Sequence, residues 1–121
     1  MSFFLKTRPL LAAMAIASLF GCANDPAPNE QLKLTEQAVA QAVAVGASDD
    51  EPDMATAQSQ LTQARADMAD KSYKDARMQA EQAELDARLA EARVLTEKSN
   101  EQLTQVNTRL DRLRKQLGAA Q

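Results

Sequence analysis

The 121-residue sequence contains no histidine, no tryptophan and a single cysteine, Cys22. Without histidine, the usual pairs of a nucleophile and a base and most transition-metal sites cannot be built. A lone cysteine also excludes a disulfide within the chain. Aromatic residues are scarce, and Tyr73 is the only one after Phe20. These absences argue against an enzyme, and we expect no cofactor, no metal and no small-molecule substrate.

Neither sign of charge dominates strongly. Lysine and arginine number 14 against 17 acidic residues, and without Lys6 and Arg8 the basic count falls to 12. This acidic balance argues against nucleic acid, which requires a basic face. The carboxylates are scattered at solvent-facing helical spacings. An enzyme with two facing carboxylates remains a rival hypothesis, although a slender helical protein offers little room for the cleft that it needs.

Residues 1–21 have the composition of a secretory signal. Lys6 and Arg8 are their only charges, and a mainly apolar run from Leu10 to Phe20 follows. That run is shorter than the roughly 20 residues needed to cross a bilayer. A basic start, a short apolar centre and a small residue before the cut are typical of a cleaved leader, with cleavage predicted between Gly21 and Cys22.

The four residues at this cut, Leu19-Phe20-Gly21-Cys22, resemble the bacterial lipobox. Phe20 departs from the pattern, because it is bulkier than the usual alanine, serine or threonine. The resemblance implies that Cys22 carries a covalent diacylglycerol and an N-acyl lipid and becomes the first mature residue. The alternatives are an ordinary signal peptide or an uncleaved anchor, but Leu19 breaks the small-residue preference of ordinary cleavage.

Residues 22–29 combine the acylated cysteine with a flexible tether that contains two prolines. Seven residues reach about 25 Å at full extension, so the domain at 30–121 stays close to the membrane. Ala23 stands where an aspartate retains lipoproteins in the inner membrane of enteric bacteria. By analogy we expect the periplasmic face of the outer membrane.

Three helices are predicted after the tether, at about 30–46, 51–70 and 72–117, which makes the fold all-α. Gly46 is expected to stop the first helix, and Asp49 or Asp50 to cap the second, with Pro52 tolerated in its first turn. Apolar residues on one side of the first helix are Leu32, Val39, Ala42 and Val43. In the second helix the narrow apolar stripe is Met54, Ala57, Leu61, Ala64 and Met68.

The third helix is expected to be long, because no glycine or proline occurs between Tyr73 and Leu117. Ser72 is the expected N-cap and Gly118 lies just past the end. One stripe has alanine at almost every position and is the expected packing surface for the second helix, as an antiparallel hairpin ending near residue 93. Its members are Tyr73, Ala76, Ala80, Ala83, Ala87, Ala90 and Val94.

A second stripe lies about 150° around the same helix. It begins with Met78, Leu85, Leu89 and Ala92, which we expect the first helix to cover, in a three-helix arrangement with the long helix in the middle. It continues in the same heptad phase as a predicted association stretch: Leu103, Val106, Leu110, Leu113 and Leu117. This is typical of a short coiled coil, with itself or with a partner helix. The alternative is that the first helix packs further along and buries it.

The residue pattern at 54–94 resembles that of a known bacterial family. The residues are Leu61-x-x-Ala64-x-x-x-Met68, then Tyr73-x-x-Ala76, then the alanine-rich run at 80–92. They are similar to domain of unknown function 4398, and the segment 39–47 also fits, so about 65 residues are covered. The resemblance implies a small, alanine-rich helical domain of the envelope, often a lipoprotein. It implies no catalytic or ligand-binding residues.

These observations predict a lipid-anchored envelope protein with a structural or interaction role, associating through its C-terminal helix. An adaptor or regulator that binds another envelope protein, such as a cell-wall enzyme or an OmpA-like protein, is the alternative. Under either hypothesis the partners are the membrane, through the lipid, and a second copy or another envelope protein, through the predicted association stretch.

Overall fold

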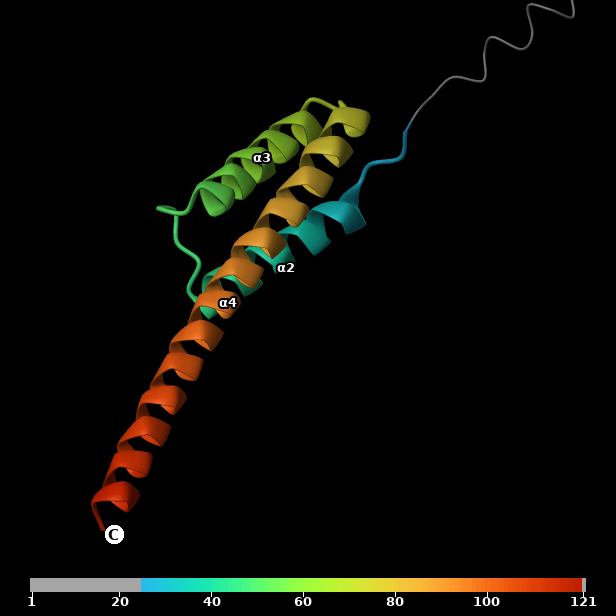
Figure 1. Ribbon diagram of the computed structural model, residues 1–121. Helices are drawn as coiled ribbons and strands as arrows, with labels where there is room; N and C mark the ends of the chain where they lie inside the picture. The colour runs from blue at the N-terminus through green and yellow to red at the C-terminus, as the bar shows by residue number, and fades with distance from the viewer. Residues whose placement is uncertain (1–24, 121) are drawn as a thin grey trace, which may run out of the picture.

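The computed structural model describes residues 25–120, which form three helices: α2 (Asn29–Val45), α3 (Pro52–Ala69) and α4 (Tyr73–Ala119). The all-α class predicted from the sequence is confirmed, with the predicted long C-terminal helix. Figure 1 shows α2 and α3 against the N-terminal part of α4, while the C-terminal part extends alone. The chain order makes α3 antiparallel to α4, and α2 runs parallel to α4.

The connection between α2 and α3 depends on Gly46. Its φ of 108° lies in the left-handed region, which glycine adopts without a steric penalty. The N–H of Gly46 donates to the carbonyl of Val43, and the N–H of Ala47 donates to that of Ala42 at 2.9 Å. These bonds satisfy carbonyls at the helix end, as in a Schellman motif. The predicted stop at Gly46 therefore has a clear backbone cause.

The predicted cap of α3 is wrong. Glu51, rather than Asp49 or Asp50, occupies the N-cap position, and it makes no side-chain cap. Pro52 fixes the first helical residue, which leaves both aspartates in the preceding turn. The Asp49 carboxylate accepts a hydrogen bond from the Gln58 amide at 2.6 Å instead.

The turn between α3 and α4 is tight. Lys71 has a φ of 60°, which is unusual for a residue with a side chain. The N–H of Ser72 donates to the Asp67 carbonyl at 2.8 Å and so closes the end of α3. Ser72 occupies the N-cap position of α4 as predicted, but its hydroxyl makes no capping hydrogen bond. Backbone hydrogen bonds therefore define this reversal.

The core is built around the alanine stripe of α4. Its inward-facing residues are fully or almost fully buried: Ala76, Ala80, Ala83, Ala87, Ala90 and Val94. From α3 the buried residues are Met54, Ala57, Leu61 and Ala64, whereas Met68 and Tyr73, at the turn, are half-buried. Small side chains let helix axes approach closely.

The position predicted for the first helix is partly wrong. It packs beside α3 on the alanine stripe, where Ala38 contacts Ala57 and Ala87. The face with Met78, Leu85 and Leu89 remains exposed, as does Ala92. The reason is that α2 has its own stripe of small residues, which fits the alanine face of α4 better than the leucine face. That stripe is Thr35, Ala38 and Ala42.

Two residues of α2 differ from the face predicted from its larger apolar side chains. Val43, predicted to face the core, is exposed, whereas the polar Thr35 is fully buried. The Thr35 hydroxyl lies 2.8 Å from the Ala80 carbonyl and 2.9 Å from the Gln31 carbonyl. A buried hydroxyl needs such an acceptor. Thr35 thereby joins α2 directly to the backbone of α4.

The bundle ends at Val94, close to the limit expected from the length of α3. All residues from Leu95 to Ala120 are exposed. The helix continues to Ala119, so the prediction that Gly118 stops it is wrong. No atom lies within 4 Å of a side chain built at Gly118, so this glycine is a solvent-facing helical residue. The 47 residues of α4 span about 70 Å.

Candidate association surface

One face of α4 carries a continuous heptad stripe that we call the seam. It begins beside the bundle and runs through the free part of the helix, with spacings that alternate between four and three residues. On an α-helix this spacing keeps all members on one side. The seam consists of Leu85, Leu89, Ala92, Thr96, Ser99, Leu103, Val106, Leu110, Leu113 and Leu117.

The seam is exposed along its whole length. Its large C-terminal residues, which form the predicted association stretch, range from 43% exposed at Leu110 to 70% at Leu117. The alternative in which the first helix covers them is wrong, because α2 ends at Val45, beside Lys98. Within residues 25–120, no other segment packs against them. A contiguous apolar stripe of this length is unusual on an isolated soluble protein.

The N-terminal half of the seam is hollowed. A shallow depression is lined by Leu89, Ala92 and Thr96, with Arg93 and Glu97 at its edge. It exists because two small side chains follow a large one on the same face. The seam therefore has a shape as well as an apolar character: large residues at both ends and a recess between them.

Ion pairs hold the bundle together beside the seam. Arg65 and Glu36 join α3 to α2 at 2.8 Å. Arg93 Nη1 lies 2.8 Å from Asp53 Oδ2 of α3, as an ion pair rather than an aligned hydrogen bond. The Lys98 ammonium donates to the Val45 carbonyl at the C-terminus of α2, where a positive charge is favoured. None of these pairs covers a seam residue.

Glu84 provides a further polar link between α2 and α4. Its carboxylate accepts hydrogen bonds from Arg88 at 2.6 Å and from the Gln31 amide at 2.7 Å. These bonds, chiefly the one from Arg88, lower the pKa of Glu84 below its usual value. The carboxylate therefore stays charged, and it fixes α2 on one flank of α4.

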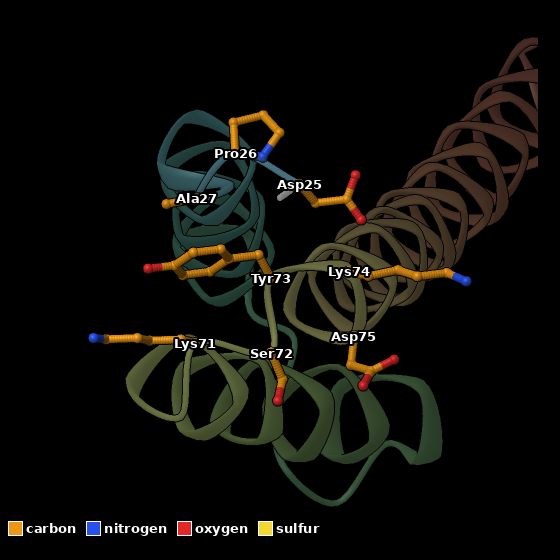
Figure 2. A pocket seen from close by; sticks show the side chains of 8 residues that line it. All are labelled: Asp25, Pro26, Ala27, Lys71, Ser72, Tyr73, Lys74 and Asp75. Carbon is orange, nitrogen blue, oxygen red and sulfur yellow. The ribbon is translucent and has the colours of Figure 1, made fainter. Parts of the chain in front are cut away.

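Another hollow lies at the opposite end of the bundle, where the chain enters α2. Its volume is about 770 Å³, and it is open to solvent. Figure 2 shows Lys71 and Lys74 extending in opposite directions, with the Asp25 and Asp75 carboxylates apart on either side of Lys74. The eight lining residues are Asp25, Pro26, Ala27, Lys71, Ser72, Tyr73, Lys74 and Asp75. This arrangement does not bring two acids together.

Residues 25–120 contain no group of three or more metal-ligating side chains that could hold an ion. No helix there is both long enough and apolar enough to cross a membrane. The signal, the cleavage position at Gly21 and the lipidation residue Cys22 lie outside the described residues.

The end of the predicted tether is not free. Pro28 is buried, and the N–H of Leu32 donates to its carbonyl at 3.0 Å. The helix begins at Asn29. The predicted flexible segment 22–29 therefore ends before Pro28, because the proline ring packs on the bundle and its carbonyl belongs to the first helical turn.

Fold and surface together define a small all-α protein, with a compact bundle of three helices and a helical extension whose apolar face is uncovered. The sequence matches the family described as Domain of unknown function (DUF4398) over residues 30–106. The chain belongs to this family, and the resemblance predicted from its alanine-rich segments is confirmed. The match also extends beyond them, to Val106 in the free part of α4.

A solved relative has the same fold. The crystal structure of a DUF4398 family protein from Pseudomonas aeruginosa PAO1 is 56% identical in sequence and superimposes with a TM-score of 0.77. The alignment covers 79% of this chain and all of that one. No curated protein matches this chain.

Proposed function

We propose that this protein is a lipoprotein of the outer membrane, anchored at the periplasmic face, with a structural or interaction role in the cell envelope. Its lipid at Cys22 fixes one end of the chain, and the seam of α4 is the surface through which it associates. The role is mechanical, and no catalytic residue is assigned. An adaptor that binds another envelope protein through the same surface is the alternative.

The observation that carries the proposal is the exposed seam. Leu103, Val106 and Leu110 stand on a helix that continues about 25 residues past the last buried side chain, Val94. Most helical stability in proteins comes from packing of an apolar face, and this stretch packs against no other part of residues 25–120. A partner on the seam supplies that packing.

The path of the chain supports an anchor beside the bundle. Pro28 is buried, and the residues just before it, Pro26 and Ala27, line a hollow with Tyr73 at the end of the bundle from which α4 starts. Cys22 precedes Pro28 by six residues, so the two lie within about 20 Å even when the chain is extended. A lipid at Cys22 therefore holds the bundle close to the membrane surface. Two or three acyl chains give stable attachment, whereas one does not.

A photo-reactive residue at position 110 tests the association. In living cells we expect an efficient cross-link, and the same residue at Thr108, exposed on another face, serves as the control. A product at a multiple of the subunit mass indicates self-association. A product that contains another envelope protein supports the adaptor role. Equal yields from positions 110 and 108, or no product from either, contradict the proposed association.

The anchor is tested separately by Cys22→Ser. We expect the variant to leave the membrane fraction, because the acceptor sulfur is gone. Metabolic labelling with a fatty acid should mark the parent chain and not the variant. A variant that stays in the membrane fraction is held there by something other than the lipid.

A further inference from the structure

We propose that the occupant of the seam is a second copy of this chain, packed antiparallel along α4 with Leu85 of each copy opposite Leu117 of the other. This inference rests on the proposed function, since it names the partner of the association surface. It also fixes orientation and register, which the proposed function leaves open.

The first argument is the match between large and small residues. In an antiparallel coiled coil, the two apolar positions of the heptad face each other across the interface, so each layer combines different residues. Around the centre of the seam, this places the small or polar residues opposite large ones. The layers are Leu85–Leu117, Leu89–Leu113, Ala92–Leu110, Thr96–Val106 and Ser99–Leu103, each occurring twice.

The hollow beside Leu89 gives this match a physical form. It is lined by Ala92 and Thr96, which in this register face Leu110 and Val106 of the second copy. The side chains of Leu110 and Val106 of the second copy therefore fill the space beside the small side chains of Ala92 and Thr96. Shape complementarity of this kind lets an interface reach the packing density of a protein interior.

A parallel pairing in register lacks this complementarity. Each seam residue then faces itself, so Ala92, Thr96 and Ser99 produce three weak layers in succession. No large apolar side chain fills the interface between Leu89 and Leu103, a distance of about 21 Å along the helix. Such a dimer leaves the hollow empty.

The charges that flank the seam favour the same orientation. In a parallel dimer, the flanking contacts join residues five apart between copies, which brings Arg88 near Arg93, Arg109 near Arg114, and Glu81 near Asp86. All three contacts join like charges, which destabilise an interface.

The antiparallel dimer replaces these repulsions by an attraction. Asp86 of each copy then faces Arg114 of the other, at both ends of the seam. Arg114 is free to make this contact, because its pair with Asp111, at 3.4 Å, is loose and exposed. The exposed Leu95 falls opposite the aliphatic part of Arg109, so a side chain outside the seam is covered too.

The register follows from how much of the seam each pairing buries. Pairing Leu85 with Leu117 buries the full stripe of 33 residues, nearly five heptads and about 50 Å long. A shift by one heptad in one direction leaves Leu85 and Leu89 without a large apolar partner, and a shift in the other places Leu113 opposite Gln82, although Leu117 then faces Met78. Association stretches of at least three to four heptads are typical of coiled coils, so including the bundle half of the seam makes the zipper long enough.

The dimer has a consequence for the anchored protein. It places the two bundles at opposite ends, with the Tyr73 positions of the two copies roughly 80 Å apart. Because the segment between Cys22 and Pro28 is short, both lipids reach one membrane only if the dimer lies along its surface. The two proposals are therefore compatible, with α4 lying along the membrane.

Mixed cysteine variants test orientation and register together. We use the full chain with Cys22→Ser, so that each added cysteine is the only thiol, and treat mixtures with a short bismaleimide cross-linker. Leu89→Cys mixed with Leu113→Cys should give a heterodimer. Neither variant alone should, because these positions lie about 36 Å apart along α4. The matched control is Leu89→Cys with Val106→Cys, the pair that a shift of one heptad would bring together; the proposed register separates these two positions by about 10 Å and the two Val106 positions by about 15 Å.

Three outcomes overturn the inference. Efficient cross-linking of either variant alone indicates a parallel dimer. A heterodimer in the control mixture that equals the test mixture excludes the register. A chain that remains monomeric in sedimentation at high concentration excludes self-association. If the chain is monomeric, a cross-link from position 110 to another envelope protein would still support the proposed function. Failure of the dimer inference and failure of the proposed function are therefore distinguishable.

A charge exchange tests the flanking contact without touching the seam. Asp86→Arg and Arg114→Asp should each raise the dimer dissociation constant about five- to tenfold, since each places like charges together twice. The double variant should restore the parent value, and Glu101→Arg, on another face, should have little effect. In a parallel dimer Asp86→Arg would instead strengthen association by facing Glu81, which would contradict the inference.

Discussion

The two halves of α4 differ in composition and in environment: residues 73–94 contain six alanines and two leucines, and residues 95–119 contain one alanine and five leucines. Between Tyr73 and Val94 an alanine stripe is buried by α2 and α3, whereas every residue from Leu95 onward is exposed. Leucines occur in both halves and are exposed in both. The comparison teaches that the bundle buries the small side chains of α4 and leaves the leucines of α4 exposed.

The energetic consequence follows from surface area. Burial stabilises by about 25 cal/mol per Å² of apolar surface, and alanine offers little of it. The bundle therefore depends on close approach between backbones, to which the Thr35 hydroxyl adds a direct link. The large apolar side chains of the seam remain exposed. Their burial can therefore stabilise only a complex with a partner.

The largest expected effect comes from placing charges on the free half. Leu103→Asp with Leu110→Asp should weaken association by at least about 100-fold, because a buried carboxylate without a partner is strongly unfavourable. Sedimentation and the in-cell cross-link measure the loss. The control is Thr104→Asp with Thr108→Asp, on another face. Loss of the cooperative unfolding transition of the bundle would instead place these leucines in its core.

The next effect compares one substitution on the two faces of the bundle half. Ala87→Leu should destabilise the fold by about 3 kcal/mol, because Ala87 is fully buried against Ala38 and Ala57. Ala92→Leu, one and a half turns away on the seam, should leave the monomer unaffected. Urea unfolding followed by circular dichroism measures both. Equal destabilisation would mean that the two faces are packed alike.

A smaller effect distinguishes the two glycines. Gly46→Ala should cost about 1 kcal/mol, because its φ of 108° is unfavourable for alanine, although the added atom meets Lys98 Nζ at an ordinary 3.5 Å. Gly118→Ala, in the exposed half of α4, should be neutral or slightly stabilising, since alanine is the better helix former. Thermal unfolding measures both. A neutral Gly46→Ala would show that the turn does not require glycine.

The smallest effect concerns acid. The pKa of Glu84 is lowered in the fold, chiefly by the hydrogen bond from Arg88, so its contribution is present above the ordinary glutamate pKa and is lost as the pH falls through the lowered value. Glu84→Gln should therefore reduce the loss of stability below about pH 4.5, by less than about 1 kcal/mol. Unfolding between pH 3 and pH 7 measures the difference, with the exposed Glu101→Gln as control. Parallel pH curves for the parent and Glu84→Gln would contradict this role.

Much of the architecture could be predicted from local signals. Gly46, Pro52 and the absence of breakers after Tyr73 set helix bounds that differ from the structure by at most two residues. The alanine stripe and the leucine stripe were both visible as heptad patterns. Local signals could not predict which face of α4 packs against α2, because the larger apolar residues of α2, Val43 among them, indicate the wrong side of that helix.

The residues that correct this choice have weak sequence signals. Thr35, Ala38 and Ala42 recur at spacings of three and four, the same small-residue pattern that marks α4, but threonine and alanine are common on exposed helix surfaces. Only the Ala80 carbonyl, 2.8 Å away, makes Thr35 a core residue. The predicted cap of α3 is wrong because Pro52 fixes the first helical residue, which leaves both aspartates in the preceding turn.

The sequence alone determined the all-α class, the length of α4 and the presence of two stripes on it, because helical periodicity and the positions of glycine and proline are local properties. The tertiary structure decided which stripe is buried. The rows of small residues on α2 and α4 let these helices pack more closely than a leucine face allows, and α3 packs Met54 and Leu61 into the same core, so α2 and α3 share the alanine side. That competition between faces leaves the seam exposed.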